Sequence, residues 1–190
     1  MIEYGCFVIK PDAYIRGIQE AILTEIRERC SAKGLATLFI KERKLTSFAV
    51  RFIYRSIADR PFFADFLQLM QEAPSMLVLV QGGIGLDRCL KEIRGSRPST
   101  SGDPATGIRG KYCSVVDVSK EDVRQWEMGV HPEQLVLSKK MLCNVLHCSD
   151  NELEALKALW VFTGFQEKVQ FLKSNSLLRG KVLCWILGHQ

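Results

Sequence analysis

The sequence predicts an α+β fold, in which one four-stranded antiparallel sheet has helices packed on one of its faces. Two observations lead to this class. Short apolar runs that stop at turn residues are typical of buried strands, and between these runs apolar residues recur at helical spacing. The chain has 190 residues, of which 47% are apolar and 25% charged, which suffices for a single domain, residues 1–190, with its own core.

The first predicted strand covers residues 5–9, an apolar run that ends at Lys10-Pro11-Asp12. From about Ile15 to Cys30 the apolar residues recur at helical spacing, so we expect a helix that Gly34 stops. Residues 35–45 alternate imperfectly between apolar and polar, which favours a second strand.

Two short helices are predicted next, over residues 48–57 and 62–71, and Asp59-Arg60-Pro61 separates them. Residues 75–81 form the strongest strand signal in the chain, and Gly82-Gly83 ends it. A third short helix is expected over residues 86–92.

The segment over residues 93–110 is rich in Gly, Pro, Ser, Thr and Arg, and a loop of this length in a compact domain is usually functional. Residues 111–142 are interpreted as an insertion, with a possible strand over 112–118. A brief apolar stretch at 144–147 then meets the start of a helix. The order of these elements fits a sandwich of the ferredoxin type.

That last helix has a clear start. Ser149 and Glu152 have the spacing of a capping box, in which the hydroxyl accepts the amide three residues on and the carboxylate reaches back. We expect the helix to continue to about Phe162. Residues 163–190 form a C-terminal extension with enough apolar residues to pack.

Composition excludes several classes. No run of about 18 apolar residues is present, so we expect no membrane span. The N-terminus has no basic stretch ahead of an apolar one, which argues against a signal peptide. Seven cysteines without a Cys-x-x-Cys motif favour a cytoplasmic protein with reduced thiols. The net charge of +5 suits anionic small molecules as well as nucleic acid.

His147 stands out because it lies at the end of a brief strand, just before a helix. A helix N-terminus carries partial positive charge and free amides, which favour the neutral, nucleophilic imidazole and attract phosphate. On the local sequence alone, the simpler interpretation is a histidine that merely precedes a helix cap.

Four motifs change this interpretation, and they occur in order along the chain: Lys10-Pro11-Asp12, Asp59-Arg60-Pro61-Phe62-Phe63, Gly107-Ile108-Arg109-Gly110 and Asn144-x-x-His147-x-Ser149-Asp150. Together they resemble nucleoside diphosphate kinase over about residues 3–162, apart from the insertion. The resemblance implies a nucleotide-binding transferase of nucleotide metabolism. It would move the γ-phosphate of ATP or another nucleoside triphosphate to a nucleoside diphosphate by a ping-pong mechanism through a phosphohistidine.

The resemblance also implies residue roles. His147 matches the histidine that becomes phosphorylated, and Lys10 and Asn144 match the residues that hold the sugar hydroxyl and the inner phosphates. Arg88 and Arg109 match two arginines that grip the phosphates. Such cations suit this chemistry, because the transition state spreads charge over the phosphoryl oxygens and guanidinium groups match them with paired donors.

Two aromatic residues complete the expected site. Phe62 matches the residue that stacks on the base, and Tyr54 matches a tyrosine packed beside the histidine. Stacking accepts any base, so low base selectivity is expected. Mg²⁺ would arrive on the nucleotide phosphates, so the protein needs no metal ligands of its own. The family also implies a homo-oligomer as the expected assembly.

The sequence lacks the glutamate that the family usually places beside the histidine. The family usually carries a glutamate about three helical turns after it, which hydrogen-bonds the second ring nitrogen, and Ala158 stands there. Glu154 lies one turn earlier and is not expected to reach the ring. We therefore expect slower chemistry than is usual in the family, unless another acceptor substitutes.

Three further departures concern two loops and a cysteine. Where the family offers a threonine to a phosphate, the candidates are Ser96, Arg97 and Thr100, and the sequence does not choose among them. The insertion between Arg109 and Asn144 either covers the nucleotide cleft, alters assembly, or both. Cys148 replaces a glycine, and its thiol is either inert or sensitive to oxidation.

Three alternatives stay open. In the first, the chain is a nucleotide-binding or scaffold module of the same fold with little turnover, as the missing glutamate and the insertion suggest. In the second, it is a nucleic-acid binder that uses the net charge, although no RNA-recognition motif or zinc-finger spacing occurs. Finally, Cys113, Cys143, His147 and Cys148 are zinc-ligand types, but two adjacent ligands make awkward geometry.

Overall fold

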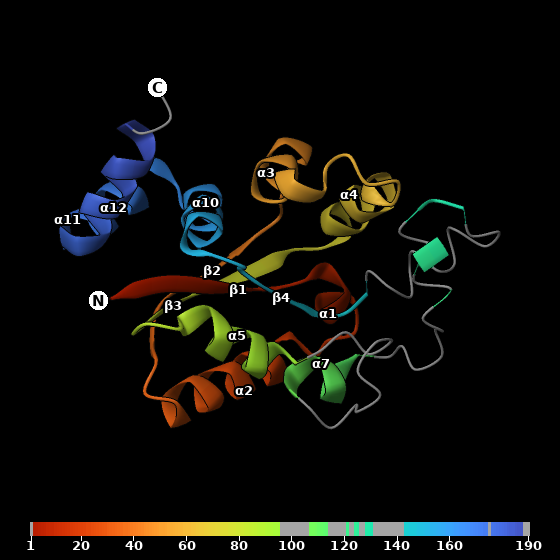
Figure 1. Ribbon diagram of the computed structural model, residues 1–190, viewed down its shortest axis with the longest axis horizontal. Coiled ribbons are helices and arrows are strands. Elements are labelled where there is room, and N and C mark those ends of the chain that lie inside the picture. The colour runs from red at the N-terminus through yellow and green to blue at the C-terminus, as the bar shows by residue number, and fades with distance from the viewer. Residues whose placement is uncertain are drawn as a thin grey trace.

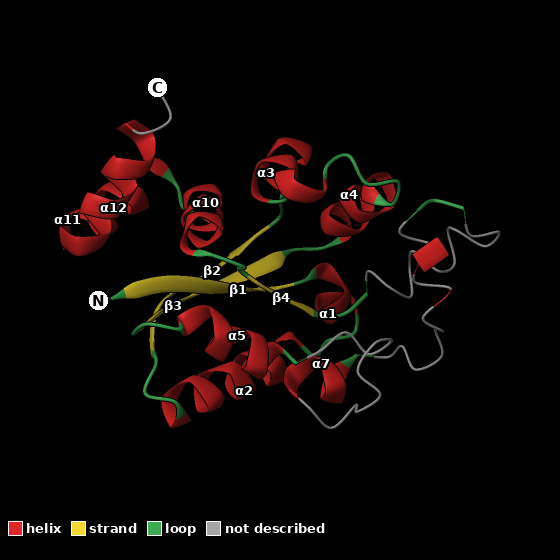
Figure 2. Cartoon of the chain, viewed as in Figure 1, coloured by secondary structure: helices red, strands yellow, loops and turns green. Residues whose placement is uncertain are grey.

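The computed structural model describes residues 2–95, 107–113, 121, 124–125, 128–130, 143–174 and 176–187. Within these residues, four strands form one antiparallel sheet in the order β2-β3-β1-β4 (Figures 1 and 2). The strands are β1 (Glu3–Ile9), β2 (Ala36–Arg43), β3 (Ser75–Gly82) and β4 (Leu146–Cys148). This order confirms the predicted four-stranded sheet of the ferredoxin type.

The helices of the described ranges connect and cover these strands. They are α1 (Pro11–Ile15), α2 (Gln19–Ala32), α3 (Ser47–Ile53), the 3-10 helix η1 (Arg55–Ile57), α4 (Phe63–Glu72), α5 (Leu86–Arg94), α7 (Gly107–Tyr112), α10 (Glu152–Phe162), α11 (Phe165–Ser174) and α12 (Ser176–Leu187). None of these helices is long and apolar enough to cross a bilayer.

Helices cover both faces of the sheet, so the prediction that they lie on one face is wrong. Figure 1 shows α3, α4 and α10 on one side and α2, α5 and α7 on the other. The reason can be seen in β1, where six consecutive residues are buried. A strand with one face toward water alternates between apolar and polar residues, whereas a strand covered on both faces is continuously apolar.

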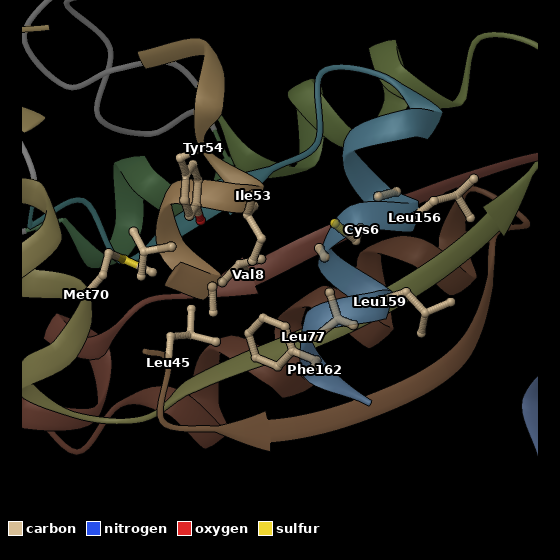
Figure 3. Packing of buried hydrophobic residues seen from close by; sticks show 14 of the residues in the cluster. Cys6, Val8, Leu45, Ile53, Tyr54, Met70, Leu77, Leu156, Leu159 and Phe162 are labelled. Carbon is tan, nitrogen blue, oxygen red and sulfur yellow. The ribbon is translucent and has the colours of Figure 1, made fainter. Parts of the chain in front are cut away.

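Two separate core clusters result. The first core cluster, on the side of α3, α4 and α10, comprises Tyr4, Cys6, Val8, Leu45, Ala49, Val50, Ile53, Tyr54, Phe62, Phe63, Phe66, Leu69, Met70, Leu77, Leu79, Ala155, Leu156, Ala158, Leu159, Phe162 and Val182 (Figure 3). The second core cluster comprises Phe7, Ile9, Ala13, Ile22, Leu23, Ile26, Cys30, Met76, Val78, Val80, Leu86, Leu90, Ile93, Ile108, Val145, Leu146 and Cys148.

Some expected elements differ from those observed. The helix expected from about Ile15 starts later, at Gln19, because α1 ends at Ile15 and a turn separates it from α2. Part of the expected loop over 93–110 is helical, since α7 begins at Gly107. Tyr112 ends that helix rather than opening a strand, and residues 114–118 lie outside the described part of the chain.

The C-terminal extension packs as expected. Helices α11 and α12 lie beside α10 at one end of the molecule (Figure 1). Val182 of α12 is buried in the first core cluster. The Lys181 ammonium contacts Glu152 Oε1 at 2.5 Å and the Ile2 carbonyl at 2.8 Å, which ties α12 to the start of α10 and to the chain ahead of β1.

Candidate active site

The candidate site lies where β1 ends beside the start of β4. β4 pairs with β1 so that His147 is opposite Val8. The Lys10 amide donates to the Val145 carbonyl, and the Val145 amide donates to Asp12 Oδ2, both at 2.9 Å. Val145 is held in the left-handed region at a φ of 57°, which costs about 1–3 kcal/mol. Such strain persists only where the surrounding structure fixes it, and here it lies two residues before the histidine.

The His147 ring is held from two sides. Its Nε2 lies 3.1 Å from Glu154 Oε1, and the Tyr54 ring packs edge-on against it with 5.1 Å between ring centroids. The His147 side chain is 19% exposed, so one edge of the ring is open to solvent. In the part of the chain that the structure describes, its Nδ1 makes no hydrogen bond. Nδ1 is therefore the ring nitrogen that a ligand would meet.

Tyr54 supplies an unusual polar group beside the histidine, where it was predicted to pack. The residue is buried, and its hydroxyl has no hydrogen-bond partner among the described residues. Burial, together with the charge of Glu154, raises the pKa of the phenol well above its usual value, so the hydroxyl stays protonated. A buried hydroxyl without a partner costs about 1–3 kcal/mol, and an incoming ligand oxygen would relieve that cost.

Glu154 reaches the histidine, contrary to the prediction. The helix starts later than the capping box suggests: its N-cap is Asn151, whose side chain accepts the Glu154 amide at 2.9 Å. Ser149 accepts the Cys6 amide of β1 instead, at 3.0 Å. Because the chain stays extended through 151, the first helical turn faces back toward β4. Ala158, where the family glutamate was expected, is fully buried in the first core cluster.

Two buried cations meet at Asn144. Lys10 Nζ donates to Asn144 Oδ1 at 3.1 Å, and Arg109 Nη2 donates to the same oxygen at 3.3 Å. Arg109 Nε also donates to the Leu146 carbonyl at 2.8 Å, which fixes its guanidinium beside β4. Burial lowers the pKa of Lys10 to about 8, with Asp12 acting in the opposite direction. The structure thus gathers three of the residues predicted to bind nucleotide into one cationic cluster.

Arg88 does not join this cluster. It lies on α5, where its side chain is 86% exposed and its Nε is 3.4 Å from Glu92 Oε1. The buried side of α5 carries Leu90 and Ile93, and Arg88 precedes Leu90 by two residues, which is about half a helical turn. Its guanidinium is therefore directed away from the sheet.

Two other cations of α5 lie closer to β4, and the sequence reasoning missed both. Lys91 Nζ is 3.6 Å from Asp150 Oδ1, at the end of the chain segment that follows β4. Arg94 is close enough to the Cys148 thiol for its positive charge to lower the thiol pKa, although burial has the larger effect and leaves that pKa raised. Arg94 follows the buried Leu90 by four residues, so both lie on the same face of the helix. This spacing in the sequence indicates that Arg94 is on the face of α5 that packs on the sheet.

Phe62, predicted to stack on a base, is buried. Only 9% of it is exposed, and it belongs to the first core cluster at the start of α4. Gly129 of the insertion lies against its neighbour Pro61, so closely that a Cβ on Gly129 would be 2.7 Å from the proline Cβ. The insertion thus contacts the segment that carries Phe62. Phe63 is also buried in the first core cluster.

The described residues on either side of the two long segments lie close together. A Cβ on Gly107 would be 2.4 Å from Gly95 Cα, so residues 95 and 107 touch. Cys113 Sγ lies 3.6 Å from the Cys143 carbonyl oxygen, so the ends of the segment 114–142 also meet. The three phosphate-binding candidates of the first segment, Ser96, Arg97 and Thr100, lie outside the described residues, as does most of the insertion.

Cys148 is separated from the histidine although the two are consecutive. It is fully buried in the second core cluster, whereas His147 packs on Tyr54 of the first. Two side chains on opposite faces of one strand cannot share a metal ion, which removes the zinc alternative that used both. Burial also raises the pKa of the Cys148 thiol, which favours the inert role for it.

Comparisons with known proteins agree with this geometry. Residues 3–167 match the sequence profile of the family described as nucleoside diphosphate kinase. Nucleoside diphosphate kinase A 1 of Bos taurus is 26% identical over 156 residues, covering 76% of this chain and 97% of the relative.

Two solved structures share the fold. One is a nucleoside diphosphate kinase of Aquifex aeolicus, with a TM-score of 0.62 at 20% identity, covering 88% of this chain and 99% of the other. The second is a nucleoside-diphosphate kinase of Borrelia burgdorferi, described as a transition state mimic with bound vanadate and ADP. It has a TM-score of 0.60 at 17% identity and covers 87% of this chain and 89% of the other.

Proposed function

Because the chain belongs to the nucleoside diphosphate kinase family, we propose that it moves the γ-phosphoryl group of a nucleoside triphosphate to a nucleoside diphosphate, with His147 as the carrier. The observation that supports this most strongly is the arrangement of His147. One ring nitrogen is engaged by Glu154, and the other makes no hydrogen bond within the described residues. Lys10 and Arg109 stand nearby as buried cations.

The proposed reaction has two half-reactions. In the first, Nδ1 of His147 attacks the γ-phosphorus, an N–P bond forms, and the bond from phosphorus to the β,γ-bridging oxygen breaks. The nucleoside diphosphate leaves with that oxygen. In the second half-reaction, a terminal oxygen of another nucleoside diphosphate attacks the phosphohistidine and the N–P bond breaks. Splitting the transfer in this way predicts ping-pong kinetics.

The cations supply the electrostatic part of the mechanism. The transition state places charge on the equatorial phosphoryl oxygens and on the leaving oxygen. Arg109 and Lys10 are largely fixed before substrate arrives, because Asn144 and the Leu146 carbonyl hold them. Fixed charges need no reorganisation during the reaction, and they act strongly in a site shielded from water. Lys91 and Arg94 are proposed to contact phosphate in place of Arg88.

Mg²⁺ is proposed to come with the nucleotide. Both Glu154 oxygens are already engaged, by His147 and the Asp150 amide, and Asp12 Oδ2 accepts the Val145 amide, while Asp12 Oδ1 is buried without a hydrogen-bond partner among the described residues. The polar surface around Lys10 and Arg109 therefore fits phosphate oxygens better than a bare cation. Bound to the phosphates, Mg²⁺ would neutralise part of their charge. The homo-oligomeric state and the cytoplasmic location stay predictions.

A second candidate, a nucleotide-binding or scaffold module with little turnover, is favoured by one observation. Phe62 is covered, and Gly129 lies against the adjacent Pro61. For stacking on a base, the ring of Phe62 must become accessible. In the scaffold alternative the ring of Phe62 stays covered.

The experiment that separates the two candidates uses γ-labelled ATP with Mg²⁺ and varied GDP. Kinase activity predicts parallel lines when reciprocal rates are plotted at several concentrations of the second nucleotide. It also predicts a protein-bound label that is stable to alkali and lost in acid. Binding of nucleotide without label or turnover would favour the scaffold.

A further inference from the structure

Glu154 is the one carboxylate that contacts the ring of His147 in the described structure, and it stands one helical turn before Ala158. We propose that Glu154 is a positioning residue that fixes the orientation and the tautomer of His147. In this chain the role of the family glutamate would then belong to a residue one turn closer to the start of α10 than Ala158. The effect on phosphorylation of His147 rests on the proposed function, whereas the contact between Glu154 and the ring does not.

Both oxygens of the Glu154 carboxylate are committed. Oε1 lies 3.1 Å from His147 Nε2, and Oε2 accepts the Asp150 amide at 2.8 Å. The backbone amide of Glu154 donates to the Asn151 side chain, which fixes the start of the helix. The carboxylate therefore has one orientation, set by the backbone around it rather than by the histidine alone.

The environment keeps this carboxylate ionised. Burial raises its pKa, but the hydrogen bonds from His147 and the Asp150 amide act the other way and leave the pKa below its usual value. A carboxylate in the first turn of a helix is also stabilised by the helix dipole. Lys157 on its own helix also lowers the pKa of this carboxylate, and the carboxylate in turn raises the pKa values of Tyr54 and Cys6 on the buried side.

An ionised carboxylate only accepts hydrogen bonds, so the Nε2 atom of neutral His147 must carry the proton. The lone pair is then on Nδ1, the atom that no described residue engages. Ala158 cannot supply this contact, since its methyl group has no acceptor. Its burial in the first core cluster also shows that the space one turn further along is filled by apolar side chains.

The test measures the tautomer directly. We expect ¹⁵N NMR of the unmodified protein to report protonated Nε2 and unprotonated Nδ1 for the neutral ring. In Glu154→Gln the preference for one tautomer weakens, because an amide both accepts and donates. Phosphorylation of His147 in that variant should slow by about 10- to 100-fold, as for other residues that orient a functional histidine. The KM for nucleotide should stay unchanged, because Glu154 does not contact the phosphates.

Glu152→Gln is the matched control. It removes the same charge from the same turn of α10, but Glu152 contacts the Tyr4 amide and Lys181 instead of the ring. It should keep the wild-type tautomer and labelling rate. Glu154→Gln with an unchanged tautomer and rate would overturn the inference. If the tautomer changes but the wild-type protein takes no label, Glu154 positions the histidine and the proposed function alone fails.

Discussion

His147 and Cys148 are consecutive residues of β4, and the two faces of the sheet give them different environments. On the first face, His147 meets a carboxylate, a phenol whose hydroxyl has no partner among the described residues, and a solvent-exposed edge. On the second face, Cys148 is fully buried among apolar side chains such as Leu90 and Ile93. Both residue types are nucleophiles, so residue type alone does not decide which one reacts.

The difference lies in what each face leaves unsatisfied. The second core cluster is filled, and Leu90 Cδ1 lies only 2.4 Å from where a Cβ on Gly5 would be. Around His147 the structure instead keeps a buried Tyr54 hydroxyl without a partner among the described residues and a buried Lys10, both of which cost stability. Costs of this kind are expected at a site that is arranged for a ligand rather than for packing.

The largest expected effect is a difference in labelling between substitutions of His147 and of Cys148. His147→Ala should abolish the alkali-stable label, because the accepting nitrogen is gone. Cys148→Ala should keep the label and lose about 1 kcal/mol of folding free energy. Filter binding of protein treated with γ-labelled ATP measures the label. A labelled His147→Ala, or an unlabelled but folded Cys148→Ala, would reverse the comparison.

The next prediction concerns packing on the second face. Leu90→Ala should reduce the free energy of unfolding by about 2–5 kcal/mol, because it removes a fully buried side chain and leaves a cavity. Urea denaturation followed by circular dichroism measures this loss. Gly5→Ala in the Leu90→Ala background should recover part of it, since the new methyl group enters the emptied space. A loss well below 1 kcal/mol would mean that this face is not closely packed.

Lys10→Ala tests the cation cluster on the first face. We expect nucleotide binding to weaken about 10- to 100-fold, the size of a lost hydrogen bond to a charged group. Stability should not fall, because removing a buried charge offsets the lost packing. Calorimetry gives the affinity, with Lys33→Ala as a surface control that contacts only Glu92 in the described structure. Equal affinities of the two variants would remove Lys10 from the site.

Tyr54→Phe should change stability in the opposite direction from most core substitutions. Since the hydroxyl has no partner in the described structure, its removal should leave the free energy of unfolding unchanged or raise it by up to about 1 kcal/mol. Thermal melting checks this. A clear destabilisation would show that the hydroxyl has a partner in the folded protein.

The smallest expected effect is the uptake of a proton by Lys10 when a nucleotide binds. Burial lowers the pKa of Lys10 to about 8, so the free protein loses this charge above about pH 8. A bound polyphosphate favours the charged form, so binding at about pH 8–9 should take up as much as one proton. The unfolded chain holds that proton more tightly, so Lys10 makes stability rise with pH between about 8 and 10.5. Calorimetry in two buffers measures the uptake, which Lys10→Ala should lack.

Much of the fold could be predicted from the sequence. The apolar run over 75–81 became β3 almost residue for residue, and the helix expected to end near Phe162 ends there. The covering of both faces was also readable, since β1 is continuously apolar rather than alternating. The order of the elements, from which one covered face was predicted, does not show how many faces the helices cover.

The site was predictable as a set of residue types and less so as geometry. The motifs placed Lys10, Arg109, Asn144 and His147 in one neighbourhood, and the structure brings them together. The role of Glu154 was missed because it depends on where α10 begins, and the capping-box pattern placed the N-cap at Ser149, two residues before the actual N-cap Asn151. A shift of two residues turns a helix by about 200°, which decides whether a side chain meets the histidine.

The central claim is that His147 carries the phosphoryl group between two nucleotides, and a single-turnover chase tests it most directly. Labelled protein is freed of nucleotide, and GDP with Mg²⁺ is added. We expect the label to leave the protein and to appear in GTP, one for each phosphohistidine lost. Label that stays on the protein, or that leaves only as inorganic phosphate, would contradict the account.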